Sequence, residues 1–515
     1  MGSSDKFCQV RSLFLLLACS LLLGCPPPSA KPQAVPLSAE ERSQVMVACG
    51  RCHPAPDPSL LPKARWEELI PTMLGMPLPK GVEQLSELEL ELALRHYTSQ
   101  APSELPRAPQ AKALSTKLAF AVEGFIPQRK EFLATRSPAV SNLRFVNLSD
   151  PNKQDLLICE MRSQSLFLLP AWAPQKQRRI MGLARGLNYP SRVLLQDLTG
   201  DRRPDLLVTG LGGMDPTNEE RGGVLLLTQT PQRKFEARAI APAVGRATDA
   251  RPADLDGDGD LDLVVCAFGW RGPGKLFVLR NEGGSPTRYE PVEVDSRDGY
   301  IHAIPHDLDQ DGDLDVVAVI AQEHERVVFL RNDGKGQLEP LTLYAAPHPA
   351  WGSSGLELHD MDGDGDLDLL VSNGDSLDDR LLKPYHGVGY LELTGLERGL
   401  PQVTYRRIGD QYGCEAASAA DLDGDGDLDV VGVSFVPQVD PKTWEGIDTV
   451  VWFERTASGW ERHALEQGRA IHPCLAIGDY DRNGKPDIAV GNYVWIGEGD
   501  RATTQADFVT LFTAR

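Results

Sequence analysis

A short acidic phrase recurs along most of the sequence and limits the folds that the chain can adopt. Its clearest form reads DLDGDGDLD, and two weaker copies read DLTGDRRPD and NLSDPNKQD. The seven copies begin at Asn147, Asp197, Asp254, Asp307, Asp360, Asp421 and Asp479. Successive copies start 50 to 61 residues apart. That period is too long for helical repeats and is typical of β-propeller blades, so the sequence predicts a mainly β protein with a seven-bladed propeller.

Each unit reads as four strands. In the unit of Asp307, YIHAIPH precedes the acidic phrase, and VVAVIA, RVVFLRN and LEPLTLYA follow it, with turn residues such as NDG between them. The run after the phrase is continuously apolar, as expected for a strand covered on both faces. The last unit is one strand short. We expect residues 117–124 to supply its outer strand, so that the two ends of the propeller pair and leave no free edge.

The acidic phrase is also a candidate metal site. Aspartates at positions 1, 3, 5 and 9, with glycine at position 6 for a sharp turn, are typical of a calcium loop, because Ca²⁺ takes six to eight oxygen ligands. A solvated acidic turn would explain one copy, but not five copies placed before the same strand. Thr199 and Arg202 weaken the copy at Asp197, and Pro151 removes the site at Asn147. About five Ca²⁺ ions are predicted, with the ligands Asp254, Asp256, Asp258, Asp262, Asp307, Asp309, Asp311, Asp315, Asp360, Asp362, Asp364, Asp368, Asp421, Asp423, Asp425, Asp429, Asp479, Asp481, Asn483 and Asp487.

The repeats resemble the FG-GAP or VCBS propellers, such as the seven-bladed head of integrin α chains, over residues 115–515. In that family the calcium ions are structural, and the resemblance implies the same role here. Only the third unit contains anything like the tripeptides that give the family its name, FG at Phe268 and GPG at residues 272–274. This departure weakens an integrin-like ligand assignment. The net charge of −21 argues against a nucleic-acid partner, because phosphate binding needs a basic face.

The first residues predict export. Lys6 and Arg11 precede an apolar run, residues 13–23, that is too short to span a bilayer and ends in LLLGC. This ending resembles a bacterial lipoprotein signal over residues 1–24, with Cys25 lipidated; a signal peptidase site with a coincidental cysteine is the alternative. Pro26 then implies an outer-membrane lipoprotein of the bacterial cell envelope, facing the periplasm or the cell surface. Residues 25–37 are proline-rich and predict an extended tether.

A second motif, CGRCHP, lies between the tether and the repeats. C-x-x-C-H is the attachment motif of c-type haem, in which Cys49 and Cys52 bind the vinyl groups and His53 binds the iron. A dithiol redox pair and half a zinc site are the rival interpretations. Capping boxes at Ser38 and Ser86 predict the first and last helices, and residues 64–74 predict a middle one. Residues 38–103 therefore resemble a small all-α, mono-haem cytochrome c-like domain.

The sequence does not decide which residue is the sixth ligand of the iron. Met73 and Met76 follow His53 by 20 and 23 residues, and we prefer Met73. His96 comes third, because it lies in the closing helix.

The strands before the acidic loops are expected to face a central channel. Side chains at odd offsets before the first aspartate share a face: Asp249, His302 and Cys474 at five residues, and Tyr300, Ser353, Cys414 and His472 at seven. They predict either a polar funnel or an ordinary wet channel wall. Cys414 and Cys474 lie in successive units, where a disulfide is plausible, whereas Cys159 and Cys266 are expected to be separate buried thiols.

Together these features favour a monomeric electron-transfer protein, in which one haem c stands beside a calcium-stabilised propeller that binds a redox protein partner or a surface ligand. No Ser/His/Asp arrangement or carboxylate pair stands out beyond the loops, so an electron carrier is favoured over an enzyme. The first alternative is an oxidoreductase or carbohydrate-active enzyme that passes electrons to the haem. The second is a cell-surface adhesion protein.

Overall fold

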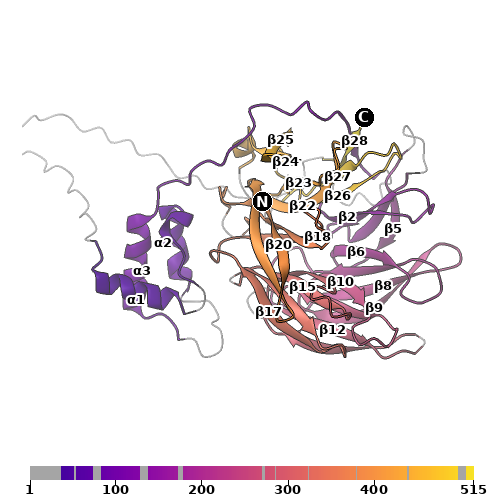
Figure 1. Cartoon of the computed structure of the whole chain (residues 1–515), viewed down its shortest axis with the longest axis horizontal. Helices are drawn as coiled ribbons and strands as arrows, with labels where there is room; N and C mark the ends of the chain where they lie inside the picture. Colours follow the sequence, from indigo (N-terminus) through magenta and orange to yellow (C-terminus); the bar gives the residue numbers. More distant parts are fainter. Residues whose placement is uncertain are drawn as a thin grey trace, which may run out of the picture.

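The computed structural model describes residues 36–51, 54–73, 83–127, 137–171, 178–269, 273–284, 286–322, 324–377, 380–437, 440–496 and 506–515. Three helices lie on one side of a larger body of β-strands (Figure 1). The predicted signal, Cys25, Cys52, His53 and Met76 lie outside the described residues. Among the described helices, none has the length and apolar character needed to cross a membrane.

The helices are α1 (Ala39–Cys49), α2 (Lys63–Thr72) and α3 (Glu87–Gln100), with the 3-10 turn η1 (Pro58–Leu60) before α2. Both predicted capping boxes are confirmed at Ser38 and Ser86. In each, the serine side chain accepts the backbone N–H of the glutamate three residues later, and that glutamate side chain accepts the backbone N–H of the serine. One small core joins the helices through Val45 of α1, Trp66 of α2 and Tyr97 of α3. The first and last helices therefore meet.

The strands form seven four-stranded antiparallel sheets, which confirms the predicted seven blades. Each of the first six sheets takes four consecutive strands: β2 (Val140–Val146), β3 (Asp155–Glu160), β4 (Ser165–Leu169) and β5 (Met181–Arg185); β6 (Pro190–Gln196), β7 (Asp205–Gly210), β8 (Gly222–Gln229) and β9 (Phe235–Val244); β10 (Ala247–Ala253), β11 (Asp262–Ala267), β12 (Lys275–Asn281) and β13 (Tyr289–Asp295); β14 (Tyr300–His306), β15 (Asp315–Ile320), β16 (Arg326–Asn332) and β17 (Leu338–Ala345); β18 (Ser353–His359), β19 (Asp368–Asn373), β20 (Gly387–Glu397) and β21 (Leu400–Asp410); β22 (Cys414–Ala420), β23 (Asp429–Ser434), β24 (Asp448–Thr456) and β25 (Gly459–Gln467). A short 3-10 turn, η5 (Pro441–Trp444), precedes β24.

The seventh blade is built from both ends of the propeller. It takes β26 (Cys474–Gly478), β27 (Asp487–Gly491) and β28 (Val509–Ala514) from the end of the chain, and β1 (Phe120–Phe125) pairs with β28 as its outermost strand. The register runs from Phe120 opposite Ala514 to Phe125 opposite Val509. The predicted closure of the ring is therefore confirmed.

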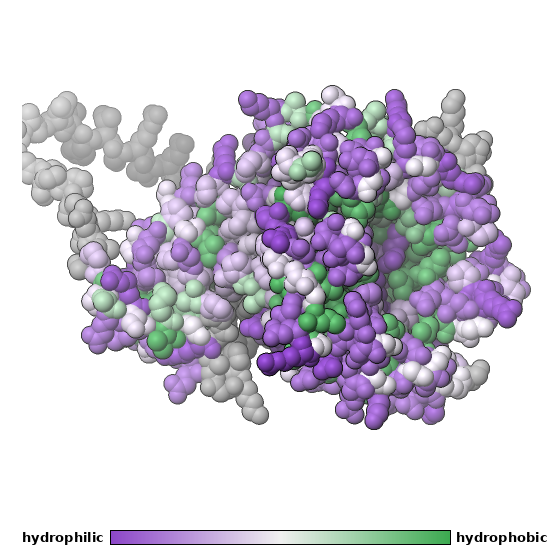
Figure 2. All heavy atoms as spheres, viewed as in Figure 1, coloured by the Kyte–Doolittle hydropathy of each residue, from purple (hydrophilic) through white to green (hydrophobic). Residues whose placement is uncertain are grey.

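The innermost strands β2, β6, β10, β14, β18, β22 and β26 neighbour one another in turn and surround the central channel. The second strands are covered on both faces, and all six residues of β15 are buried. The hydrophobic cores lie between blades: Val317 and Phe329 of the fourth blade pack with Leu369 and Leu391 of the fifth. Outside these cores, hydrophilic side chains cover most of the face seen in Figure 2.

The four cysteines of the propeller are buried and free. The disulfide suggested for Cys414 and Cys474 is therefore wrong, although their blades are neighbours. Cys474 Sγ faces Val140 of the first blade, whereas Cys414 Sγ lies beside Gly432 of its own blade. Cys159 and Cys266 are separate buried thiols, as predicted.

The segment between α3 and β1 is fastened to the sixth blade. The backbone N–H of Ala108 donates to the Tyr412 hydroxyl at 2.6 Å, and that of Ala111 donates to Asp448 Oδ2 at 2.9 Å. On the helical side, Leu381 of the propeller packs against the core of the helices. The helices are thus docked on the propeller as well as joined to it.

The closing strand β1 should decide whether the propeller is stable. A chain that starts at residue 127 lacks β1, so the edge of β28 and the site of buried Phe125 are exposed. We expect it to unfold at a lower temperature and to aggregate, as followed by circular dichroism and light scattering. A chain that starts at residue 104 keeps β1 and is the control; equal unfolding temperatures for the two would contradict the closing role.

Candidate functional site

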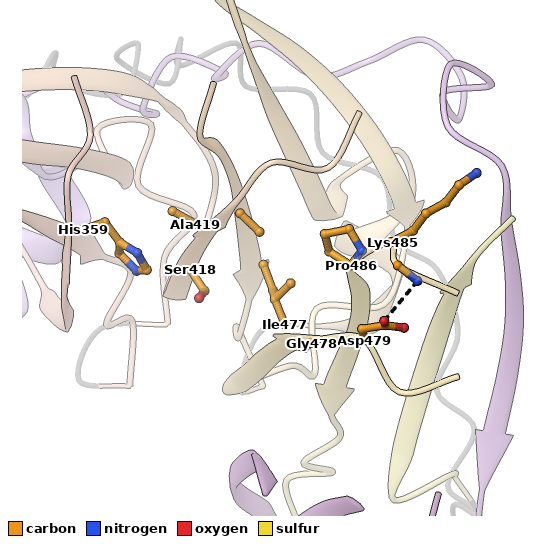
Figure 3. A pocket seen from close by; sticks show the side chains of 10 residues that line it. His359, Ser418, Ala419, Ile477, Gly478, Asp479, Lys485 and Pro486 are labelled. Carbon is orange, nitrogen blue, oxygen red and sulfur yellow. Dashed lines mark hydrogen bonds between the residues drawn. The ribbon is translucent and has the colours of Figure 1, made fainter. Parts of the chain in front are cut away.

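The five acidic loops share one turn between the first and second strands of their blades. In each, the backbone N–H of the glycine at position 6 donates to the first aspartate at 3.0 to 3.2 Å. Figure 3 shows this contact as the dashed line at Asp479 in the seventh blade. These glycines have φ between +83° and +103°, a region that L side chains rarely adopt. The turn therefore favours glycine at position 6.

The same turn persists where the acidic pattern weakens. In the second blade, the N–H of Arg202 donates to Asp197 at 2.7 Å, and Arg202 has a φ of +66° in place of a glycine. Thr199 replaces an aspartate at position 3 of this loop, so the turn forms without the full set of carboxylates. The turn is thus a property of the fold, and the additional aspartates need a separate explanation.

The additional aspartates gather into oxygen-rich clusters. In four loops, three carboxylates place an oxygen within 4.8 Å of each of the others: Asp254, Asp256 and Asp258; Asp307, Asp309 and Asp311; Asp360, Asp362 and Asp368; Asp421, Asp423 and Asp425. Asp254 Oδ1 and Asp307 Oδ1 are buried and accept no hydrogen bond within the described part of the chain. Buried carboxylate oxygens without donors suit a hard cation, and the donor set fits Ca²⁺.

The aspartate at position 9 has a role that the sequence analysis missed. In all seven blades its Oδ1 accepts a backbone N–H from the third strand, or from the residues just beyond it, at 2.8 to 3.1 Å. In six blades its Oδ2 also accepts an N–H from the start of the acidic loop. This aspartate therefore clasps the loop to the third strand. The signal was present in the sequence, because position 9 alone is aspartate in all seven copies.

Because the aspartates at position 9 are buried, the clasp is sensitive to whether they are ionised. The aspartates at position 9 are at most 3% exposed, and burial raises the pKa of Asp315, Asp368 and Asp429 to about 6. The neighbouring carboxylates of each loop raise these pKa values further. A cation in the loop would favour the ionised forms.

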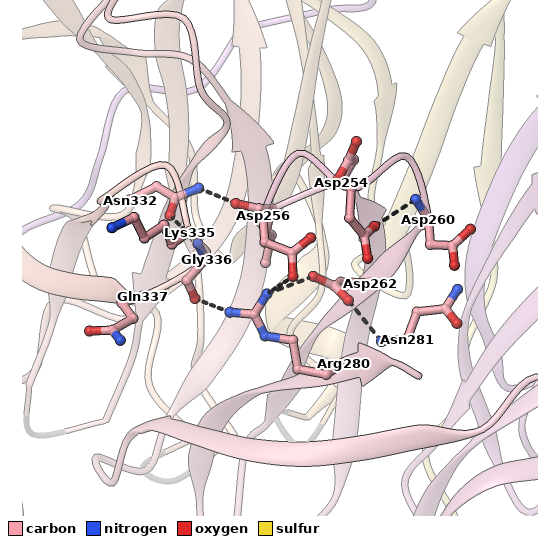
Figure 4. A network of polar contacts seen from close by, with 12 residues as sticks. Asp254, Asp256, Asp260, Asp262, Arg280, Asn281, Asn332, Lys335, Gly336 and Gln337 are labelled. Atoms are coloured by element: carbon pink, nitrogen blue, oxygen red, sulfur yellow. Dashed lines mark hydrogen bonds and ion pairs between the residues drawn. The ribbon is translucent and has the colours of Figure 1, made fainter. Parts of the chain in front are cut away.

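In the third blade an arginine enters the acidic loop. Arg280 Nη1 lies 3.1 Å from both Asp256 Oδ2 and Asp262 Oδ2, and Nη2 donates to the carbonyl of Gly336 in the fourth blade (Figure 4). Asn332 of the fourth blade also donates to the carbonyl of Leu255, at 2.7 Å. The loop thus joins two blades as well as two strands.

The predicted haem motif is described in part. Cys49 is half-buried at the end of α1, and the Tyr97 side chain lies beside its thiol. Arg51 pairs with Glu89 at the start of α3 and approaches the carbonyl of Gln84, whose amide donates to the carbonyl of Met73 at 3.1 Å. Met73 therefore lies at the same end of the helices as Cys49.

His96 has a different setting. Its ring is buried, and Nδ1 lies 2.9 Å from the Gln100 amide, one turn further along α3. Three apolar side chains, by contrast, are exposed in the last turn of α1 and the first turn of α3: Met46 at 39%, Val47 at 67% and Leu88 at 62%. An exposed apolar end of this kind suits a large apolar group.

The channel differs from its prediction. Asp249 and His302 belong to one polar cluster, in which Arg192 Nε lies 3.2 Å from Asp249 Oδ1 and Arg251 Nε lies 3.0 Å from the same atom. Cys474 is instead packed in a hydrophobic core, and the whole set at seven residues is buried: Tyr300, Ser353, Cys414 and His472. A register shift in the first strands explains the error for Tyr300 and Cys414, but not for Cys474, where β26 pairs with β27 without a shift. It falls between Tyr300 and His302 in one blade and between Cys414 and Ala416 in another, so the side-chain alternation changes there.

Four further polar residues of the channel were missed: Arg144, Arg192, Arg251 and Glu357. Arg192 lies five residues before the first position of its unit, the offset that located Asp249 and His302. Arg144, Arg251 and Glu357 lie three residues before the first position of theirs. Counting all side chains at these two offsets would have found them.

Comparison with known proteins agrees with the architecture. Residues 197–265 and 307–371 match the FG-GAP-like repeat, and each match runs from one acidic loop into the second strand of the next blade. The protein is thus a seven-bladed β-propeller, and its blades carry FG-GAP-like repeats.

Three curated relatives are similar over a short region. Cartilage acidic protein 1 is 31% identical over 139 residues in Mus musculus, 32% over 134 residues in Xenopus tropicalis and 30% over 139 residues in Homo sapiens. In each case the match covers 24% of this chain and 20% of the relative. The chain thus spans about a fifth of the length of these relatives.

The clasp can be tested in the second blade, where the full acidic set is missing. Asp205 is fully buried and accepts N–H groups from Leu198 and Gln229, so Asp205→Ala leaves both unsatisfied. We expect a loss of about 3 kcal/mol in the free energy of unfolding, measured by urea denaturation and equal with and without a calcium chelator. Asp201→Ala, in the same loop but partly exposed, should cost less than about 1 kcal/mol. A negligible loss for Asp205→Ala would refute the clasp.

Proposed function

We propose that this protein is a c-type cytochrome of the bacterial cell envelope, anchored by a lipid on Cys25, whose calcium-stabilised propeller binds a redox protein partner. The observation that carries the proposal is the C-x-x-C-H motif of the sequence. Its first cysteine, Cys49, ends α1 at the same end of the helices as Met73, with the exposed apolar side chains of Met46 and Val47 in the turn before it. Electron transfer is the function that best fits one haem on a propeller without a recognisable catalytic triad.

The described residues fit a haem. Cys49 would hold one vinyl group, while Cys52 and His53 would supply the second thioether and the proximal ligand. Met46, Val47 and Leu88 would be covered by the porphyrin, and Met73 would be the sixth ligand in preference to His96, whose ring is already buried and paired with Gln100. The bound haem would accept and release one electron. Docking through Leu381 and the segment around Ala108 would keep it beside the propeller.

Calcium is the second component of the proposal. The clustered carboxylates and the buried oxygens without donors support Ca²⁺ in the loops of the third to sixth blades. The oxygen-bearing side chains of Asp479, Asp481, Asn483 and Asp487 extend the proposal to the seventh. Each ion would join the loop to the clasp and would thereby stiffen the blade. This role is structural, and it leaves the faces of the propeller free to bind a partner.

Removing calcium should destabilise the protein in a pH-dependent way. Burial raises the pKa of Asp315, Asp368 and Asp429 to about 6, above the unfolded value of 3.8, so without a cation their ionisation opposes folding as the pH rises through 6. Ca²⁺ binds the ionised forms and offsets this cost. Chelation should therefore lower the melting temperature by several degrees at pH 7.5 and by less at pH 5.

The chelation experiment has a matched pair of variants. Asp309→Ala should reduce the calcium bound per chain by one, measured by atomic emission after dialysis, whereas Asp150→Ala in the metal-free first loop should not. Excess Ca²⁺ should restore the melting temperature of the chelated protein. An unchanged melting temperature on chelation at pH 7.5 would exclude structural calcium.

The haem is tested by spectra of protein matured in the periplasm. Cys52→Ala should lose covalent haem absorbance, and full retention would exclude the cytochrome.

Met73→Ala should lose the iron–sulfur charge-transfer band of the oxidised protein and lower the reduction potential, because a methionine ligand raises it. Met46→Ala is the control on the same apolar surface. A reversible couple without turnover on sugars or alcohols supports electron transfer, whereas substrate-driven haem reduction would favour an enzyme.

A further inference from the structure

Three arginines from successive blades meet in the central channel. Arg144 lies on β2, Arg192 on β6 and Arg251 on β10, strands that neighbour one another in the inner ring. The guanidiniums are close enough that Arg192 and Arg251 both lower the pKa of Arg144, which burial and these two charges bring to about 10. A protein with a net charge of −21 thus concentrates positive charge at its axis.

The carboxylates of the channel are already paired. Asp249, whose side chain is 1% exposed, accepts Arg251 Nε through both oxygens at 3.0 and 3.1 Å, and its Oδ1 lies 3.2 Å from Arg192 Nε. The Asp249 carboxylate is therefore shared by two guanidinium groups, those of Arg192 and Arg251. Glu357, on β18, lies 2.9 Å from His359 Nε2. Its influence on Arg144 and Arg192 is exerted at longer range, and no direct contact joins it to either within the described residues.

His302 adds a donor to the same space. Arg192 Nη1 lies 2.9 Å from His302 Nδ1, and because a guanidinium only donates, Nδ1 accepts and the proton lies on Nε2. Burial and the charge of Arg192 lower the pKa of His302, in agreement with a neutral ring. The neutral imidazole therefore presents an N–H donor beside the arginines.

Arg144 has no hydrogen bond or ion pair within the described part of the chain. Among the arginines and carboxylates of the channel, three positive charges face two negative ones. An unpaired charge in a low-dielectric channel is costly unless a counter-ion accompanies it. The excess is one positive charge, which corresponds to one monoanionic group.

The side of the channel that holds Glu357 lies next to a cavity. His359 and Ser418 line this cavity of about 360 Å³ between the fifth, sixth and seventh blades, with Asp479 and Lys485 at its edge (Figure 3). The same two residues contact Glu357. The cavity therefore lies beside the second carboxylate of the channel.

We propose that the channel binds a small oxyanion, a carboxylate or phosphate group, with Arg144 as its main ligand and with Arg251 and His302 beside it. A guanidinium presents two parallel N–H groups to such a group, which adds direction to the charge attraction. This site is independent of the haem and of the calcium loops, and it gives the propeller a small-molecule ligand in addition to a protein partner.

The full-length, calcium-loaded protein should be titrated with inorganic phosphate and, separately, with acetate, by isothermal calorimetry at constant ionic strength. Saturable one-to-one binding of either is expected, and the tighter of the two identifies the ligand class. Arg144→Gln should weaken binding at least about tenfold, because it removes both the charge and the fork of donors. Arg288→Gln, on an exposed turn of the third blade, is the control and should bind as the parent does.

Two further variants keep the test decisive. Arg144→Lys preserves the charge without the planar fork and should weaken binding less than Arg144→Gln. Glu357→Gln removes a competing negative charge and should tighten binding. The haem spectrum and the calcium-dependent melting temperature of these variants should match the parent, which separates this proposal from the proposed function. Absence of binding for both anions, or unchanged binding by Arg144→Gln, would overturn the inference.

Discussion

Each blade depends on one buried carboxylate, the aspartate that begins its second strand. It accepts backbone N–H groups from the third strand in every blade and from the acidic loop in six, so three segments of the sheet are joined at one point. This aspartate is present in the weak as well as the strong copies of the acidic phrase. The clasp therefore does not depend on a bound metal ion. The additional aspartates of the acidic loop form an outer layer around it in some blades. Blades of unequal length can thus share one inner geometry.

The sequence predicts features that depend on local pattern and fails where the pattern shifts. The spacing of the acidic phrase, the four strands per blade and the closing strand near Phe120 follow from alternation and turn residues, which short stretches specify. The sequence did not predict which side chains of the first strands face the channel, because a register shift next to His302 and Ala416 changes the side-chain alternation. The contact of Arg280 with the carbonyl of Gly336 was equally hidden, since it depends on how one blade lies against the next.

Charge is sorted by position in this propeller. The aspartates gather in the loops on one face, whereas arginines from the first three blades gather in the channel, and Asp249 balances only part of their charge. The first set would suit divalent cations and the second would suit anions, so the loops and the channel wall would attract opposite ions. The helices stay apart from both sets, docked at the outside through Leu381.

The pairing of β1 with β28 has a consequence for how the chain reaches its native state. Phe125 and Val509 are opposite in the register, yet almost the whole propeller separates them along the chain. During synthesis the first strand emerges long before its partner, and only the arrival of β28 completes the seventh sheet. Contacts of such high sequence separation form slowly, because the entropy of closing the chain is lost before the contact is gained. Until then, six blades can be complete while the ring is an open arc with two unprotected edges, a form that chaperones and proteases would recognise.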